Sequence, residues 1–196
     1  MQRQGKVQRN TFETQIALSI DLDGQGTSQV STGVPFLDHM LTLFSKHGLF
    51  DFTVNATGDT DVDDHHTTED VGICLGQAIK SAIGDKTGIK RYGHAIVPMD
   101  DALAEVVIDL SDRPHFIFKG DIPSQKVGTF DTELVTEFLE KLSIESRMNL
   151  HVIVHYGQNT HHIIEAVFKA LGRALDTATI VDSRITGVLS TKGTLG

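Results

Sequence analysis

The residues best suited to chemistry in this sequence are two histidine doublets, each with a glutamate close behind. The first doublet opens the phrase HHTTED at residues 65–70, and the second opens HHIIEA at residues 161–166. A shift of 96 residues places one phrase on the other and continues to match apolar and glycine positions beyond it. Imidazole nitrogens and carboxylate oxygens are common ligands of first-row divalent metals. The repeat therefore predicts metal binding by a structural unit that is used twice.

Each phrase begins a predicted amphipathic helix. Apolar residues recur at helical spacing after both doublets, at Val71 and Leu75 in the first copy and at Val167 and Leu171 in the second. Side chains three or four positions apart lie on one face of a helix, so either histidine of a doublet can reach the glutamate. Adjacent histidines point about 100° apart around the helix axis and are poorly placed to share one ion. We therefore predict two separate ions.

The repeat also predicts the organisation of the chain. We expect an α/β fold made of one compact domain with two similar halves, residues 1–88 and 89–196, each a strand–strand–helix–strand–helix unit. In the first half the expected elements are a hairpin of strands at 11–22 and 27–31, a helix at 36–50, a strand at 50–56 and a helix at 65–83. In the second half they are strands at 92–98, 104–110 and 115–118, a helix at 132–146, a strand at 150–156, a helix at 161–177, and a strand followed by a loop at 180–196.

Each half also offers one earlier ligand on the preceding helix. In the first half this is His39, and counting back through the second half to the matching helix finds Glu137. The mixture of imidazole and carboxylate suits Mn²⁺, Fe²⁺, Co²⁺ or Zn²⁺ in roughly octahedral sites. Neither cluster contains a thiolate, which argues against a structural zinc. An open coordination position on each ion would leave room for substrate.

A simpler interpretation holds for the other histidines and for the acidic loop. One histidine at the start of a helix is more often a cap or a surface residue than a ligand. The histidines at 47, 94, 115, 151 and 155 lack a carboxylate partner at helical spacing and are expected to make ordinary hydrogen bonds. Asp61, Asp63 and Asp64 resemble a calcium loop, but the glycine and the final glutamate of such a loop are missing. A solvated acidic loop is the better interpretation.

Composition limits the classes of partner. The chain has 196 residues, 39% of them hydrophobic, and a formal net charge of -9, which argues against nucleic acid and anionic membranes as partners. Its lone cysteine, Cys74, excludes a disulfide framework and fits a reducing cytoplasm. No stretch approaches the roughly 20 apolar residues of a membrane span. The sequence therefore predicts a soluble cytoplasmic protein.

Several further phrases carry a resemblance to a known family. Together with the two histidine phrases, RNTFET at 9–14, GVPFLDHML at 33–41, EAVFKALGRAL at 165–175 and STKG at 190–193 resemble imidazoleglycerol-phosphate dehydratase of histidine biosynthesis. The resemblance implies an α+β sandwich with helices packed between two sheets. It also implies a lyase with two Mn²⁺ per active site, a homo-oligomer of 24 subunits built from trimers, and active sites made by more than one subunit.

The resemblance also assigns roles to individual residues. It implies catalytic roles for Glu13, Glu69 and Glu165. The implied metal ligands are His39, His65, His66, Glu69, His161, His162 and Glu165, with Glu137 where many relatives have a histidine. At that position either a carboxylate ligand or a site of altered affinity is expected. The implied substrate contacts are Glu13, His39, His65, Arg91, Arg113, His161, Lys169, Ser190, Thr191 and Lys192. Arginine and lysine donors of this kind suit a phosphate monoester.

The substrate of this family suggests a mechanism. Imidazole glycerol phosphate must lose water from carbons that carry no carbonyl, so direct removal of the hydrogen by a carboxylate would be too slow. If two ions hold the ring nitrogens, a metal-bound imidazolate can expel the neighbouring hydroxyl and give a diazafulvene, whose C–H is acidic. Loss of that proton gives an enol and then the ketone, imidazole acetol phosphate. We expect Glu13 to carry protons as general acid and base.

Two other classes of protein remain open from the residues alone. A dinuclear metallohydrolase acting on a phosphoester would use similar ligands and would release phosphate from its substrate. A non-enzymatic metal store would also use helices that carry histidine and carboxylate. The store gives no reason for the basic residues at 91, 113, 169 and 192.

Overall fold

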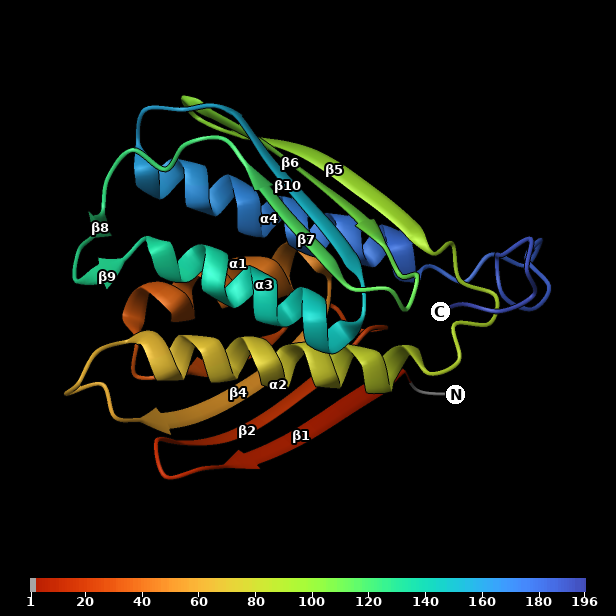
Figure 1. Ribbon diagram of the computed structural model, residues 1–196, viewed down its shortest axis with the longest axis horizontal. Coiled ribbons are helices and arrows are strands. Elements are labelled where there is room, and N and C mark those ends of the chain that lie inside the picture. The colour runs from red at the N-terminus through yellow and green to blue at the C-terminus, as the bar shows by residue number, and fades with distance from the viewer. Residues whose placement is uncertain (1–2) are drawn as a thin grey trace.

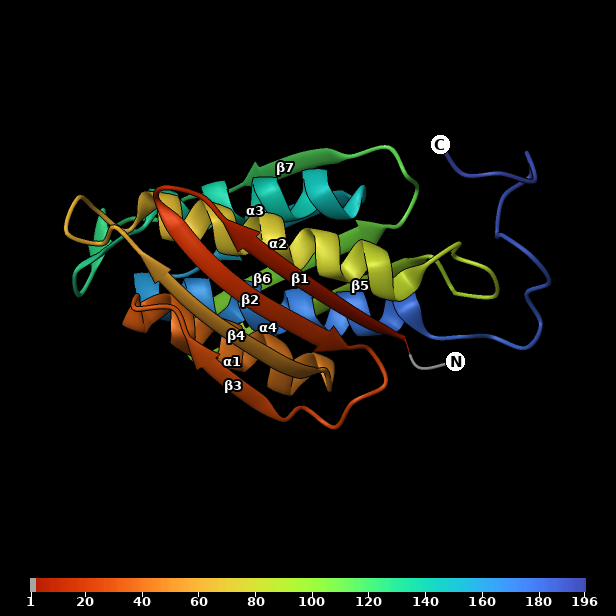
Figure 2. The ribbon, with the colours of Figure 1, turned by 90° about the horizontal axis from the view of Figure 1, so that it is seen from below.

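The computed structural model describes residues 3–196 and has four layers, with a β-sheet on each outside and two pairs of helices between them (Figure 1). The expected α+β sandwich with helices packed between two sheets is confirmed. Seen from below, the first sheet covers the helices of its own half (Figure 2). Among the described residues, no helix is long and apolar enough to cross a membrane.

The two halves follow the same order of elements. The first half consists of β1 (Gln4–Asn10), β2 (Thr14–Asp21), β3 (Ser28–Ser31), α1 (Pro35–Gly48), β4 (Asp51–Gly58) and α2 (His65–Ile83). The second half consists of β5 (Tyr92–Met99), β6 (Ala102–Asp109), β7 (His115–Lys119), the short pair β8 (Lys126–Val127) and β9 (Phe130–Asp131), α3 (Glu133–Ser146), β10 (Asn149–Tyr156) and α4 (Thr160–Thr179). All four helices were expected from the sequence.

The sheets have equivalent topologies. The first has the order β1-β2-β4-β3 and the second the order β5-β6-β10-β7. In each sheet two antiparallel pairings are followed by one parallel pairing, between β3 and β4 or between β7 and β10. The internal duplication therefore extends from the sequence phrases to the whole architecture.

Three expectations about strands were wrong. The first half begins with three strands rather than two, and β1 was missed because Val7 is its only large apolar residue. The expected hairpin between β2 and β3 does not form, because β2 pairs with β1 and β4 while β3 pairs with β4. The tail after residue 180 is not a strand, since it makes only an isolated bridge between Val181 and Ile89.

The helices of the two halves pack directly on each other, α1 against α4 and α2 against α3. Glycine makes this close approach possible: a Cβ atom on Gly172 of α4 would lie 2.4 Å from the carbonyl oxygen of Phe44 in α1. At the repeated position in α2, a Cβ on Gly76 would lie 2.9 Å from the carbonyl oxygen of Leu142 in α3. These two contacts set the distance between helices that carry the predicted ligands.

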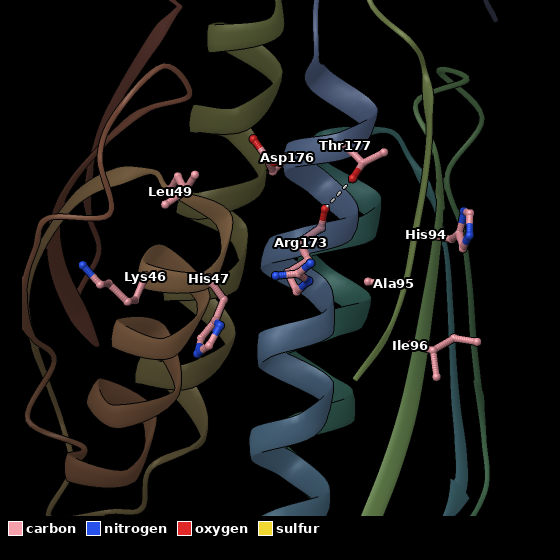
Figure 3. Close-up of a pocket in the computed structure, with 9 residues that line it drawn as sticks. All are labelled: Lys46, His47, Leu49, His94, Ala95, Ile96, Arg173, Asp176 and Thr177. Atoms are coloured by element: carbon pink, nitrogen blue, oxygen red, sulfur yellow. Dashed lines mark hydrogen bonds between the residues drawn. The ribbon is translucent and has the colours of Figure 1, made fainter. Parts of the chain in front are cut away.

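An open cavity of about 640 Å³ lies between α1, α4 and β5 (Figure 3). Lys46, His47 and Arg173 give it a basic wall, while Asp176 is the one carboxylate among its lining residues. It contains none of the predicted metal ligands or phosphate contacts. This cavity is therefore separate from the candidate site described below.

Replacing Gly172 by alanine should destabilise the protein. Helix propensity alone would stabilise the alanine variant by about 1 kcal/mol, but the added methyl group would collide with the backbone of α1, and overpacking of this kind costs about 1–3 kcal/mol. Urea unfolding followed by circular dichroism measures the difference, with Lys80→Ala on the exposed side of α2 as the control. Unchanged or increased stability of Gly172→Ala would show that α1 and α4 are not held at this distance.

Candidate functional site

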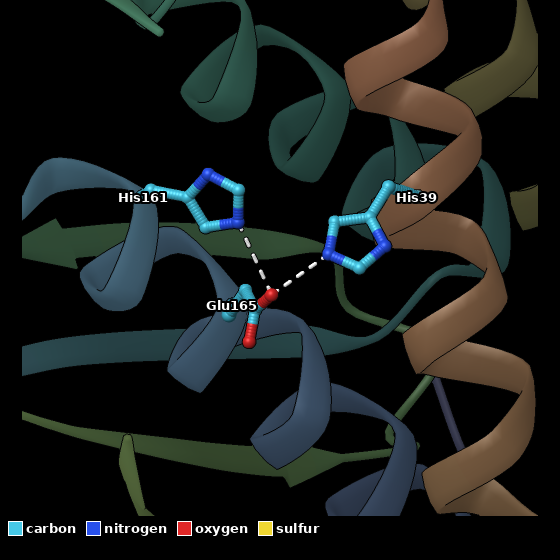
Figure 4. A group of neighbouring side chains, drawn as sticks. All are labelled: His39, His161 and Glu165. Atoms are coloured by element: carbon cyan, nitrogen blue, oxygen red, sulfur yellow. Dashed lines mark hydrogen bonds and ion pairs between the residues drawn. The ribbon is translucent and has the colours of Figure 1, made fainter. Parts of the chain in front are cut away.

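The first candidate metal centre joins α1 to the start of α4 (Figure 4). Glu165 Oε1 lies 2.7 Å from His39 Nε2 and 3.2 Å from His161 Nε2. One ligand atom from each of the three residues lies within 4.8 Å of the others. Two imidazole nitrogens and one carboxylate oxygen in this arrangement fit a first-row divalent ion with coordination positions left open.

The second candidate centre joins the start of α2 to α3. It contains His65, Glu69 and Glu137, whose ligand atoms also lie within 4.8 Å of one another. His65 Nε2 is 3.9 Å from Glu69 Oε2. Glu137 is therefore the third potential ligand of this centre, as His39 is of the first. One imidazole and two carboxylates fit the same class of ions, with a harder and more negative donor set.

Side chains at the helix starts hold the histidine doublets in place. Asn159 is the N-cap of α4, and its Oδ1 accepts hydrogen bonds from the backbone N–H groups of His161 and His162. In the loop just before α2, Asp63 Oδ1 accepts a hydrogen bond from the backbone N–H of His65 at 2.8 Å. Such caps satisfy N–H groups that have no partner in the helix. They fix the first turn, from which the ligands project.

Glu165 is the most buried of the predicted ligands, with 9% of its side chain exposed. Burial alone would raise the pKa of its carboxyl, but hydrogen bonds from Lys169, His39 and His161 lower that pKa to about 2. The carboxylate is therefore charged at neutral pH and available as a ligand. Lys169 Nζ lies 2.7 Å from Glu165 Oε2, the oxygen that does not face the histidines.

A lysine also contacts the second centre. Lys141 Nζ is 2.9 Å from Glu69 Oε1 and 3.1 Å from Glu137 Oε1. The hydrogen bond to Glu69 and, to a smaller extent, the hydrogen bond to Glu137 raise the pKa of Lys141, so its ammonium group is charged. The lysine links α2 to α3 at the level of the metal ligands.

The second histidine of each doublet lies outside both triads and contacts an aspartate instead. His66 Nδ1 lies 3.0 Å from Asp59 Oδ2, and His162 Nδ1 lies 2.6 Å from Asp101 Oδ1. In metal sites, a carboxylate that accepts from one ring nitrogen commonly orients the other nitrogen toward the ion. Both side chains are partly exposed, by 33% for His66 and 25% for His162. Within this chain, only the first histidine of each doublet belongs to one of the two triads.

The predicted phosphate contacts gather in a separate cavity of about 660 Å³. Its lining includes both arginines and all three tail residues of the prediction: Arg91, Arg113, Ser190, Thr191 and Lys192. Arg91 is already engaged, because its Nε donates to Asp109 at 2.6 Å and its Nη1 donates to the carbonyl of Leu189 at 2.8 Å. Arg91 thus also anchors the tail. Lys169 lies beside Glu165 and is not part of this cavity.

The cavity lined by the predicted phosphate contacts lies at the opposite end of the molecule from the candidate metal centres. Helix α4 begins on the left of Figure 1, with His161 in its first turn, whereas the backbone N–H of Arg91 donates to the carbonyl of Ala178 near the other end of the same helix. A rise of 1.5 Å per residue makes this separation roughly 25 Å. A small phosphorylated ligand is too short to reach from one to the other within a single chain.

Sequence reasoning missed three residues that shape the site. Asp59 lies in the acidic loop that was interpreted as solvated, and Asp101 and Lys141 had no assigned role. The equivalent placement of Asp59 and Asp101 against the doublets depends on the folded sheets, and no local spacing indicates it. Lys141 offered one signal, since it follows Glu137 at helical spacing.

Known proteins resemble this chain over its full length. The sequence profile described as imidazoleglycerol-phosphate dehydratase matches residues 32–175. The imidazoleglycerol-phosphate dehydratase of Geobacillus thermodenitrificans is 71% identical over 195 residues and covers 100% of both chains. That of Bacillus subtilis is 67% identical over 187 residues and covers 95% of this chain and 96% of its own.

This chain belongs to the imidazoleglycerol-phosphate dehydratase family. A crystal structure of imidazoleglycerol-phosphate dehydratase from Staphylococcus aureus superimposes with a TM-score of 0.83 at 45% identity and covers 91% of this chain and 99% of its own. The Pyrococcus furiosus structure also gives 0.83, at 37% identity, and covers 96% of this chain and 100% of its own. The protein is a hydro-lyase of histidine biosynthesis with imidazoleglycerol-phosphate dehydratase activity.

Replacing Asp59 by asparagine should weaken divalent metal binding by about tenfold or more, because loss of a carboxylate that orients a ligand histidine has this effect in other metal sites. Calorimetric titration with Mn²⁺ measures the change. Asp61→Asn, in the same loop and exposed, is the matched control. Equal affinities for the two variants would mean that Asp59 does not orient His66 toward an ion.

Proposed function

We propose that the dehydration depends on two divalent ions, Mn²⁺ in the first instance, one at each of the two centres. The observation that carries this proposal is the pair of triads, His39 with His161 and Glu165, and His65 with Glu69 and Glu137. Both offer nitrogen and oxygen donors within reach of one ion, and neither contains sulfur. This donor chemistry suits Mn²⁺ better than a structural zinc.

Each centre is completed by a histidine from a neighbouring copy of the chain. His66 and His162 are oriented by Asp59 and Asp101, are partly exposed, and cannot turn into the triad beside them without losing these contacts. Phe12, in the loop that also carries Glu13, has a fully exposed ring of the kind enriched at protein interfaces. These features support a homo-oligomer, and the resemblance to the family implies 24 subunits built from trimers.

The separation within one chain supports the same arrangement. Metal ligands and phosphate cavity lie about 25 Å apart along α4, so one substrate molecule must be held by ligands of one copy and the cavity of another. Arg113 and Lys192 supply positive charge in that cavity, and Ser190 and Thr191 supply hydroxyl donors. Charge-assisted bonds of this type bind a phosphate monoester strongly.

Bound at the ring nitrogens of the substrate, the ions would act as Lewis acids and lower the pKa of the ring N–H. The chain supplies the remaining parts. Glu165 and Glu69 hold the ions and complete the catalytic centre. Loss of the ring proton would let the ring expel the neighbouring hydroxyl, which leaves with a proton as water, and form a diazafulvene. Removal of a C–H proton from the diazafulvene and return of a proton to a ring nitrogen would give the enol, which tautomerises to the ketone.

Glu13 moves the protons in this scheme. It lies in the loop between β1 and β2, its side chain is 55% exposed, and its Oε1 is 3.8 Å from His66 Nε2. A carboxylate next to a ligand histidine is within reach of a substrate held there, and general acid–base catalysis requires such reach. A cytoplasmic location fits this biosynthetic role and the free, buried Cys74.

Incubating the Mn²⁺-loaded protein with imidazole glycerol phosphate, and assaying ketone and free phosphate separately, tests the proposal. Ketone should form only when metal is present, and no phosphate should be released. Glu13→Gln should bind metal and substrate normally but turn over at least about a hundredfold more slowly, the usual contribution of a general acid–base group. Ketone formation after complete metal removal, or near-normal turnover by Glu13→Gln, would contradict the scheme.

A mixing experiment tests whether the active site is shared between copies. His162→Ala removes a ligand at the metal end, and Arg113→Ala removes a phosphate contact at the other end, so each variant alone should be nearly inactive. Hybrid oligomers, co-expressed with two different tags and purified by both, should regain a measurable fraction of the activity. Hybrids as inactive as the parents would place the whole site within one chain.

A further inference from the structure

The glutamates of the two centres use their oxygens in the same way. Glu165 presents Oε1 to His39 and His161, while Oε2 accepts from Lys169 at 2.7 Å. Glu69 presents Oε2 to His65, while Oε1 is 2.9 Å from Lys141. In each centre one oxygen therefore faces the imidazole and the other is held by an ammonium group.

The two lysines come from different positions in the repeat. Lys169 follows Glu165 by one turn of α4, and the position that matches it in α2 is occupied by Ile73. Lys141 is on α3, one turn after Glu137, and the position that matches it in α1 is occupied by Leu43. The lysine–glutamate contacts of the two centres are therefore not related by the internal repeat. Each half instead reaches the same arrangement with a lysine of its own.

The second centre carries more negative charge than the first. Glu137 replaces an imidazole by a carboxylate, so that Glu69 and Glu137 face one another across the site. Lys141 contacts both carboxylates at 2.9 and 3.1 Å, whereas Lys169 contacts one. The ligand oxygens of the two carboxylates lie within 4.8 Å of each other, so their negative charges repel. An ammonium group that contacts both carboxylates offsets this repulsion.

We propose that Lys141 is a built-in counter-ion of the second centre, which holds Glu69 and Glu137 together before the metal binds and thereby lowers the affinity of this centre for its ion. The inference rests on the proposed metal centres. A cation bound to both ligand carboxylates competes with an incoming divalent ion for the same negative charge, and it also repels that ion. Lys141 is thus a positioning residue that sets the affinity of the second centre for its ion.

The test compares Lys141→Met with wild type, with Lys141→Arg, which keeps the charge, and with Lys80→Met, which changes an exposed lysine of α2. Free Mn²⁺ is followed by electron paramagnetic resonance during titration of the metal-free oligomer. Wild type should bind two ions per chain with different affinities. In Lys141→Met, the affinity for the more weakly bound Mn²⁺ should rise by about tenfold or more, and this increase should be smaller at high salt.

A second measurement keeps the proposal independent of turnover. Metal-free Lys141→Met should unfold at a lower temperature than metal-free wild type, and Mn²⁺ should restore more stability to the variant than to wild type. Lys141→Arg and Lys80→Met should behave like wild type in both measurements. Affinities within twofold of wild type for Lys141→Met, or weaker binding, would overturn the role of Lys141 while leaving the two centres intact. Failure of wild type itself to bind two ions per chain would overturn the centres and, with them, this inference.

Discussion

The packing of α1 against α4, and of α3 against α2, is the constraint on which the rest of the structure depends. Each candidate centre takes ligands from two helices, so no centre exists unless these helices lie close together. Gly172 and Gly76 allow the close approach. It places His39 at 2.7 Å from Glu165, although 126 residues separate them in the sequence. The buried Glu165 carboxylate is then stabilised by imidazole and ammonium groups.

Duplication explains the architecture better than it explains the chemistry. The two sheets have equivalent strand orders, and both histidine doublets begin a helix of the same kind. The ligands and their partners are less symmetrical. One centre has His39 and the other Glu137, and the two supporting lysines lie at positions that do not correspond. Two equivalent frameworks would therefore present the two proposed ions with different surroundings, which suits a substrate ring whose two nitrogens are chemically distinct.

Much of the fold and of the site followed from local patterns. The four helices and both histidine phrases were predictable because helical periodicity and i, i+4 spacing are properties of short segments. Strand β1 was missed because it is an edge strand with one large apolar residue, Val7. The pairing of β3 with β4 is parallel and non-local, so turn residues after β2 wrongly indicated a hairpin. Asp101 and Lys141 act through contacts made only after folding.

The central claim is that each triad holds one divalent ion. Anomalous diffraction at the manganese absorption edge, from crystals of the Mn²⁺-saturated protein, tests it most directly. The account predicts two peaks per chain, one between His39, His161 and Glu165 and the other between His65, Glu69 and Glu137. A single peak per chain, or peaks away from these triads, would contradict it.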